Sequence, residues 1–334
     1  MASPAALQEA GSDAADFGRL LSLLDRGQPV AVQTHDYPDL DAVASAWGLA
    51  RLLATKGFSA RPCYRGTIRS RSLTKMVAEL HIELGEDRLP CPSTQVIIVD
   101  GSPANGNVSP IEGRLLAVID HHKREKDPSA PYIDIRPELA SCSALIVGYW
   151  KAAGECLPRD LATAFLAGIQ SDTDFLSRRV TPTDFMAYAE LFELGDFDQA
   201  SRIVRTALDL RELDLVIKAL QKAETRNGVF FAWLPGSCGQ EVLAVLAEFV
   251  LRTEELRLTI VAECGAEGEG PDGVHLSLRS KDPALSAFAV VKRALEGIGS
   301  GGGHAHSAGG FVPHASYPGH EVLKERFFAS AIST

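Results

Sequence analysis

Residues 115–122, Leu-Leu-Ala-Val-Ile-Asp-His-His, place an acidic side chain and two imidazoles directly after an uninterrupted apolar run. Such a run is typical of a strand that is buried on both faces of a parallel sheet. In open parallel sheets, ligands bind at the edge formed by the carboxyl ends of the strands. We therefore expect Asp120, His121 and His122 to lie at the ligand-binding edge of a sheet.

Other carboxylates and one more imidazole reach this edge in the same way. The run Val96–Val99 precedes Asp100, and the run 30–34 precedes His35. The candidate metal ligands, in chain order, are His35, Asp39, Asp41, Asp100, His121 and Asp172. Carboxylate oxygens mixed with imidazole nitrogens suit Mn²⁺ better than a thiolate site would. The set predicts a metal-activated hydrolase.

Two of these carboxylates also have a structural explanation. Asp39 and Asp41 precede or open a helix expected from residue 40 to residue 56, where either carboxylate can cap the helix N-terminus. Taken alone, capping and metal ligation are equally consistent with these residues. His35, four residues before Asp39, shifts the balance toward a metal.

The remaining candidates have alternatives as well. Asp100 stands before a glycine, as turn residues often do, and Asp172 can cap a following helix. A lone histidine is more often a hydrogen-bonded core residue, but two histidines after Asp120 at a predicted active edge favour chemistry.

The order of the expected elements predicts an α/β protein of two domains. Strands that alternate with helices predict a mostly parallel sheet with flanking helices in the N-terminal part. One helix is expected from 198 to 223. We place a metal-binding catalytic domain at 13–205, a connecting helix or linker at 206–226, and a smaller substrate-binding α/β domain at 227–330.

Composition excludes several classes of protein. The 334 residues are 46% hydrophobic and carry a net charge of −10, which argues against tight, sequence-independent binding of long duplex nucleic acid. Residues 1–16 lack the apolar core of a signal peptide, and the stretch 242–251 is too short to span a bilayer. We expect a cytoplasmic protein with no membrane association. Its six scattered cysteines are expected to be buried, reduced thiols.

A second signal is the glycine run 299–304, Gly-Ser-Gly-Gly-Gly-His. Such glycines are often a flexible linker, but this run lies inside a predicted domain. Glycines let backbone N–H groups approach a phosphate closely, and His304 adds a donor. Arg279, at the end of a predicted strand, can make a bidentate phosphate contact, although a single arginine is more often a solvated edge residue.

Five motifs together resemble the DHH/DHHA1 phosphoesterase superfamily. They are HDYPDLDA at 35–42, IIVDGS at 97–102, IDHHK at 119–123, GIQSDTDF at 168–175 and GSGGGHAHSAGG at 299–310. The motifs occur in the family's order over nearly the whole chain. This superfamily includes the exonuclease RecJ, short oligoribonuclease/pAp phosphatases and cyclic-dinucleotide phosphodiesterases.

The resemblance implies a DHH domain, a DHHA1 domain and two Mn²⁺ ions, with Mg²⁺ as an alternative. One ion would be held by His35, Asp39, Asp100 and Asp172. The other would be held by Asp41, Asp100, His121 and Asp172. Asp120 would support the imidazole that it precedes. The residues implied to act on or hold substrate are Asp100, His121, His122, Asp172, Arg279, Gly301, Gly302, Gly303 and His304.

The implied activity is hydrolysis of phosphoester bonds in small nucleotides. Two ions about 3.5–4 Å apart activate a bridging hydroxide for in-line attack on phosphorus. Short single-stranded RNA and 3′-phosphoadenosine 5′-phosphate are the leading substrates, with cyclic or linear dinucleotides next and polyphosphate less favoured. A catalytically inactive nucleotide sensor is the alternative outside enzymes, and a homodimer is compatible with the sequence. Asp174 and the segment Ala305-His306-Ser307 depart from the family pattern, and these departures bear on substrate preference rather than on the metal site.

Overall fold

The computed structural model describes residues 16–66, 68, 70–86, 93–123, 126, 128–205, 208–236, 240–264 and 273–332. Two compact units make up the chain, Met1–Thr206 and Ala207–Thr334. Several predictions of the sequence analysis lie outside the described residues. They are the absence of a signal peptide (residues up to 15), the domain start at residue 13, and the burial of Cys91 and Cys238.

A six-stranded parallel sheet forms the centre of the first unit, in the order β3-β2-β1-β4-β5-β6. Its strands are β1 (Val30–Gln33), β2 (Ala60–Tyr64), β3 (Gly85–Glu86), β4 (Gln95–Val99), β5 (Arg114–Asp120) and β6 (Tyr132–Ile135). Val32 pairs with Ile97, and Ile98 pairs with Val118. The α/β fold with a parallel sheet is confirmed.

Six helices follow the strands of this unit. They are α2 (Leu40–Thr55), α3 (Arg71–Glu79), α4 (Cys142–Ala152), α5 (Arg159–Thr173), α6 (Pro182–Leu194) and α7 (Phe197–Arg205), with a short 3₁₀ turn, η1, at Pro103–Asn105. Side chains cap the starts of α2, α3, α4 and α6. Ser141 caps α4 by accepting a hydrogen bond from the Ala144 amide.

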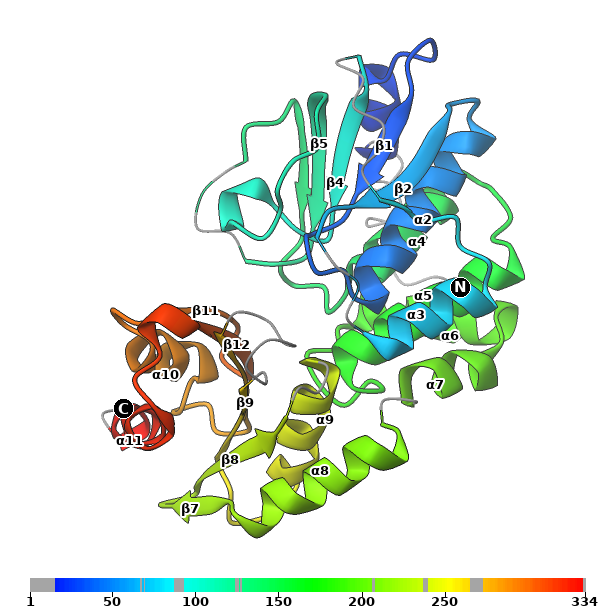
Figure 1. Cartoon of the computed structure of the whole chain (residues 1–334). Helices are drawn as coiled ribbons and strands as arrows, with labels where there is room; N and C mark the ends of the chain where they lie inside the picture. Colours follow the sequence, from blue (N-terminus) through cyan, green and yellow to red (C-terminus); the bar gives the residue numbers. More distant parts are fainter. Residues whose placement is uncertain are drawn as a thin grey trace. The chain divides into compact units, whose positions relative to one another are not determined.

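The sheet is buried on both faces, which explains its uninterrupted apolar runs. Val32, Ile97 and Ile119 face the main core, which they share with α2, α4 and α5. Figure 1 shows these helices gathered on one face of the sheet. Ile98 and Val118, one residue out of phase, face a smaller core closed by the loop residues Val108, Ile111 and Ala130.

The helix expected from 198 to 223 is wrong, because two helices occupy that region. α7 ends at Arg205, and α8 (Leu210–Gln221) begins a new helix in the second unit. Asp209 accepts a hydrogen bond from the Glu212 amide, and Glu212 accepts one from the Asp209 amide. This reciprocal cap is a start signal that the helical periodicity of the region conceals.

The second unit contains a mixed sheet in the order β11-β12-β10-β9-β8-β7. Its strands are β7 (Glu224–Arg226), β8 (Val229–Pro235), β9 (Leu258–Cys264), β10 (Gly273–Ser280), β11 (Ser300–Gly303) and β12 (Ser307–Pro313). Strands β8 and β9 are parallel, and the other neighbours are antiparallel. The glycine run thus forms one strand of a hairpin at the sheet edge.

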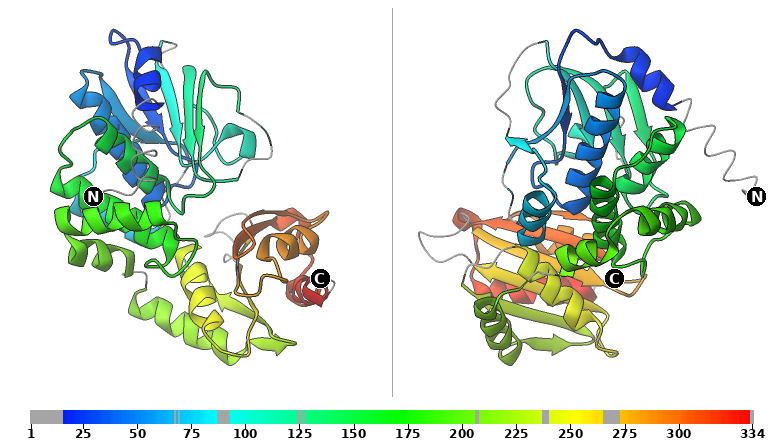
Figure 2. Two further views of the ribbon diagram at one scale, coloured as in Figure 1. Left: turned by 180° about the vertical axis from the view of Figure 1, so that it is seen from behind. Right: turned by 90° about the vertical axis from the view of Figure 1, so that its right-hand side faces the viewer.

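Helices pack on both faces of this second sheet. α10 (Ala287–Ala294) and α11 (His320–Ile332) pack on the face that carries Leu276 and Leu278, whereas α8 and α9 (Gln240–Leu251) pack on the face that carries Val261. In the right-hand view of Figure 2, α8 and α9 lie in front of the strands and the C-terminal helix lies behind them.

Cysteine burial agrees only in part with expectation. Cys63 and Cys142 are buried, as expected, but Cys156 is exposed. It lies in the turn between α4 and α5, where no core covers it.

Candidate metal centre

The carboxyl edge of the first sheet brings the six candidate ligands together. His35 follows β1, Asp100 follows β4 and His121 follows β5. Helices supply the others, because Asp39 precedes α2, Asp41 lies in its first turn and Asp172 lies in the last turn of α5. Residues from five elements thus meet at the edge that the sequence pattern predicts.

Three ligands form a first group around His35. Its Nε2 atom lies 3.9 Å from Oδ2 of Asp39 and 3.8 Å from Oδ2 of Asp100. One ligand atom from each residue fits within a sphere suited to one metal ion. This trio agrees with three of the four ligands implied for the first ion.

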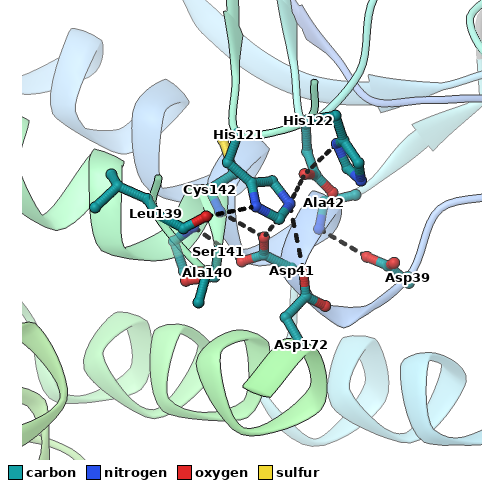
Figure 3. A network of polar contacts seen from close by, with 12 residues as sticks. Asp39, Asp41, Ala42, His121, His122, Leu139, Ala140, Ser141, Cys142 and Asp172 are labelled. Atoms are coloured by element: carbon teal, nitrogen blue, oxygen red, sulfur yellow. Dashed lines mark hydrogen bonds and ion pairs between the residues drawn. The ribbon is translucent and has the colours of Figure 1, made fainter. Parts of the chain in front are cut away.

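A second group surrounds His121. Its Nε2 atom lies 3.4 Å from Oδ2 of Asp172 and 4.0 Å from Oδ2 of Asp41. Figure 3 shows the His121 ring reaching toward both carboxylates. Among the described residues, the ligand atoms of Asp172, Asp41 and His121 lie close enough together to hold one ion. Asp172 does not join the His35 trio in this way.

Asp100 belongs to both surroundings. Its Oδ2 faces His35, while its Oδ1 lies 3.2 Å from Nε2 of His121. The backbone at Asp100 has a φ of 55°, an uncommon value for a residue with a side chain. A strained backbone at the end of β4 therefore aims one carboxylate between the two groups.

The orientation of His121 is set by a backbone carbonyl. Nδ1 of His121 lies 3.3 Å from the carbonyl oxygen of Leu139. Because a carbonyl only accepts hydrogen bonds, Nδ1 carries the proton and Nε2 presents its lone pair to the carboxylates. This is the arrangement of a histidine that ligates a metal.

Two buried atoms test whether a cation fits this site. Oδ1 of Asp100 and Nε2 of His121 have no hydrogen-bond partner among the described residues, and each side chain is only 1% exposed. Both atoms are acceptors, so they cannot satisfy each other. Buried acceptors left in this way are costly, and a shared cation would satisfy both. The residues therefore fit a metal site.

The pKa values of the buried carboxylates also indicate a cation site. Burial raises the pKa of Asp100 well above its usual range, and the charges of Asp41 and Asp39 raise it further. Burial and the same two neighbours also raise the pKa of Asp172 well above its usual range. Burial is likewise the main cause of the raised pKa of Asp41. So much buried negative charge is unfavourable unless a positive charge accompanies it.

The three aspartates for which helix capping was the alternative to metal binding differ in whether they cap a helix. Asp39 does cap α2, since its Oδ1 accepts from the Ala42 amide at 3.0 Å, while its Oδ2 faces His35. Asp41 accepts from the amides of Cys142 and Ser143 at 2.7 and 2.9 Å, which fixes it against the start of α4. Asp172 caps no following helix, because it lies inside α5.

Asp120 supports a different imidazole from the one expected. Its Oδ1 lies 2.8 Å from Nδ1 of His122, whereas it reaches His121 only at the backbone amide. The ring of His121 is held by Leu139 instead. Burial lowers the pKa of His122, but the hydrogen bond from Asp120 and the charge of Asp100 outweigh it and raise that pKa. Asp120 thus favours a protonated His122.

Sequence reasoning missed one residue behind the site. Asp184 is buried and accepts hydrogen bonds from the Ala140 amide at 3.0 Å and from the Thr181 hydroxyl at 2.6 Å. It thereby holds the segment whose Leu139 carbonyl orients His121. The pattern Thr181-Pro182-Thr183-Asp184 is a capping box at the start of α6, and that signal was present in the sequence.

The other predicted substrate residues lie in the second unit. Gly301, Gly302 and Gly303 lie in β11, and His304 begins the turn to β12. Arg279 lies in β10, where its Nε is 3.2 Å from Oε2 of Glu248 in α9. A predicted phosphate ligand thus already pairs with a carboxylate of its own unit.

Comparisons with known proteins agree with this geometry. Residues 29–169 match the model of the DHH family, N-terminal domain. An uncharacterized protein of Methanocaldococcus jannaschii is 28% identical over 86% of this chain and 59% of its own length. A Bacillus cereus protein described as a "probable manganese-dependent inorganic pyrophosphatase" is 30% identical over 51% of this chain and 57% of its own length. The chain thus spans less than two-thirds of each of these relatives.

Two solved structures share the fold. An exopolyphosphatase-related protein from Bacteroides fragilis superimposes with a TM-score of 0.76 and 18% identity, over 97% of this chain and 96% of its own. RecJ from Thermus thermophilus in complex with Mn²⁺ gives a TM-score of 0.57 and 17% identity, over 96% and 55%. None of the described helices is long and apolar enough to cross a membrane. Residues 29–169 of the chain are thus similar to the N-terminal domain of the DHH family, and the fold is shared with these two solved structures.

Proposed function

We propose that the chain is a dimetal phosphoesterase, dependent on Mn²⁺, that hydrolyses phosphoester bonds of small nucleotides. Short oligoribonucleotides and 3′-phosphoadenosine 5′-phosphate are the substrates that we place first. One observation carries the proposal: four carboxylates and two imidazoles converge at one sheet edge, where the facing atoms of Asp100 and His121 are buried without a hydrogen-bond partner. Mixed oxygen and nitrogen ligands suit Mn²⁺, with Mg²⁺ as the alternative ion.

The residues of the chain hold this centre ready. Amides of α4 fix Asp41, and the Leu139 carbonyl turns Nε2 of His121 toward the carboxylates. When bound, the ions would supply an activated water and neutralise the charge of the phosphate. We assign Asp100 and Asp172 as the shared ligands, although Asp172 is grouped only with the second trio.

His122 is the group that we assign to the reacting phosphate. The hydrogen bond with Asp120 raises the pKa of this imidazole, which favours a positively charged donor beside the metal ligands. A charged donor binds a phosphate oxygen more strongly than a neutral one. Asp120 is then a positioning residue that acts through His122.

The second unit supplies the remaining contacts in this proposal. Arg279, the glycines of β11 and His304 would hold the part of the substrate that is not being cleaved. An arginine matches the geometry of a phosphate, and glycines allow a ligand to approach the backbone. A cyclic or linear dinucleotide satisfies the same requirements and is the next substrate class.

Hydrolysis of inorganic pyrophosphate or polyphosphate is a second candidate. Support comes from the relatives described as manganese-dependent inorganic pyrophosphatases, which match about half of this chain. A nucleotide sensor without catalysis is the third, and the filled ligand positions disfavour it.

The test is a substrate panel with purified full-length protein in Mn²⁺. The panel contains 3′-phosphoadenosine 5′-phosphate, the dinucleotide pApA, cyclic dinucleotides, short RNAs, pyrophosphate and polyphosphate. Turnover of a nucleotide that is lost in Asp100→Ala and His121→Ala is the expected result. Turnover restricted to pyrophosphate or polyphosphate would favour the second candidate. Nucleotide binding by an equally inert wild type and mutants would favour the sensor.

A further inference from the structure

One face of the second sheet is cleared of side chains beside its glycine hairpin. Residues paired across antiparallel strands share a face, so Arg279 lies with Ser307, and Gly309 lies with Gly302. A Cβ atom added to Gly302 would meet nothing within 4 Å, and one added to Gly309 would approach only the backbone oxygen of Leu276, at 3.7 Å. Both glycines are exposed. The backbone of this face is therefore open to a ligand.

An aromatic pair borders the cleared area. His275 and Phe311 lie opposite each other on β10 and β12, with ring centroids 4.8 Å apart. Strand alternation puts both on the same face as Arg279 and Gly309. Phe311 is half-buried. The apolar π surface of Phe311 suits a nucleobase and offers no hydrogen-bond donor to an inorganic phosphate chain.

A carboxylate stands beside the phosphate-binding candidate. Oε2 of Glu248 lies 3.2 Å from Nε of Arg279, and the two side chains are only 27% and 15% exposed. Nη1 of Arg279 donates to the hydroxyl of Ser277 and to the carbonyl of Leu278. The guanidinium is thus fixed in place, and any anion that reaches it comes close to the charge of Glu248.

We propose that Glu248 makes this face selective for the nucleoside end of a ligand over an inorganic phosphate chain. A carboxylate only accepts hydrogen bonds, so it is satisfied by a sugar hydroxyl or an amino group of a base. Pyrophosphate and polyphosphate offer oxygen acceptors and negative charge, which Glu248 repels. This inference deepens the proposed function and rests on it for the assignment of Arg279.

The test measures binding to the full-length protein in EDTA, where metal-dependent turnover does not interfere. Titration calorimetry gives the Kd of 3′-phosphoadenosine 5′-phosphate and of inorganic tripolyphosphate for the wild type, for Glu248→Gln and for the control Glu254→Gln. Glu254 follows α9 and is exposed. The expected preference of the wild type for the nucleotide is about tenfold, the size of one charge-assisted hydrogen bond.

Glu248→Gln should reduce this preference by at least about fivefold, chiefly by tightening tripolyphosphate binding, because a neutral amide no longer repels it. Glu254→Gln should leave both constants unchanged. Glu248→Ala provides a second variant that removes the charge if the glutamine variant folds poorly. Equal affinities in the wild type, no binding of either probe, or an unchanged ratio in both Glu248 variants would overturn the inference. Mn²⁺-dependent hydrolysis by the wild type, assayed separately, shows whether the proposed function itself fails.

Discussion

Nε2 of His121 and Oδ1 of Asp100 lie 3.2 Å apart at the carboxyl edge of the first sheet, and both are buried acceptors without a hydrogen-bond partner among the described residues. The surrounding carboxylates of Asp41 and Asp172 have pKa values raised first by burial. This arrangement is unfavourable for the protein alone and favourable around a cation.

The first prediction concerns Asp100→Asn, which removes one charge from the cluster and keeps its shape. In the metal-free protein, this variant should be more stable than the wild type by about 3 °C in Tm, because less buried charge repels. It should lose both the rise in Tm on adding Mn²⁺ and the hydrolytic activity. Thermal melts in EDTA and in Mn²⁺ measure the two Tm values, and a hydrolysis assay in Mn²⁺ measures the activity. A metal-free variant that melts below the wild type would contradict the electrostatic argument.

The second prediction concerns Asp184, whose carboxylate hydrogen-bonds to Ala140 and Thr181 behind the site. Asp184→Asn places an amide donor among the donors of Ala140 and Thr181, so the segment that bears the Leu139 carbonyl should shift. We expect the affinity for Mn²⁺ to fall about 10–100-fold, as for other residues that orient a ligand. Calorimetric titration of Mn²⁺ measures it.

Asp160→Asn is the matched control, because that carboxylate is partly exposed and forms an ion pair with Arg51 in α2, away from the candidate ligands. It should bind Mn²⁺ like the wild type. Equal affinity in the Asp184 variant would show that Leu139 holds His121 without help from Asp184.

The third prediction separates two neighbouring glycines of β11. A Cβ atom at Gly301 would lie 2.8 Å from both methyl carbons of Val291 in α10, whereas one at Gly302 would meet open space. Gly301→Ala should therefore lower the free energy of unfolding by about 1–3 kcal/mol through overpacking. Gly302→Ala should leave stability within about 0.5 kcal/mol of wild type and should weaken binding of 3′-phosphoadenosine 5′-phosphate.

Denaturant unfolding and calorimetry on the two variants measure these effects. A Gly302 variant that binds the nucleotide as well as wild type would remove this glycine from the ligand face. A stable Gly301 variant would show that α10 yields to the added methyl group.

The residues at the strand ends explain how much of this site was predictable. Buried parallel strands carry apolar runs, so the sequence alone places Asp100 and Asp120 at the carboxyl edge of the first sheet. β6 was not predicted, because Tyr132–Ile135 is short and contains Asp134, whose charge is matched by Arg136 at 2.8 Å. A hydrophobicity pattern does not reveal that an ionic partner compensates the charge of Asp134 within the strand region.

Side-chain partners were harder to predict than side-chain locations. That His121 belongs to the edge follows from its place after β5, but its hydrogen bond to Leu139 crosses between separate segments. The pairing of Arg279 with Glu248 is also non-local. The two-helix structure of 197–221 was readable in principle, since Asp209 and Glu212 form a capping box.

The fourth prediction uses that cap. Asp209→Ala removes the acceptor for the Glu212 amide and should destabilise α8 by about 1 kcal/mol. Asp214→Ala on the same helix removes only an exposed ion pair with Lys218 and should cost about 0.3–0.5 kcal/mol. Denaturant unfolding compares the two. Equal effects would mean that the cap contributes no more than a surface pair.

The last prediction concerns Gly168 in α5, which lies against the candidate ligand Asp41. A Cβ atom at this position would be 2.9 Å from Oδ1 of Asp41 and 2.5 Å from the hydroxyl of Ser143. Gly168→Ala should displace Asp41 and lower the affinity for Mn²⁺, although alanine favours the helix by about 1 kcal/mol. The free energy of unfolding in EDTA should therefore fall by less than the free energy of Mn²⁺ binding does.

Gly48→Ala is the contrasting variant, because its Cβ atom would lie 2.2 Å from the ring of Phe165, inside the core between α2 and α5. It should lower the Tm in EDTA strongly, while Asp41 keeps its hydrogen bonds to Cys142 and Ser143. Calorimetric titration of Mn²⁺ and thermal melts in EDTA on both variants separate metal binding from packing. If Gly168→Ala bound Mn²⁺ as tightly as the wild type, the close contact between α5 and Asp41 would be irrelevant to the metal, and Asp41 would no longer be a credible ligand.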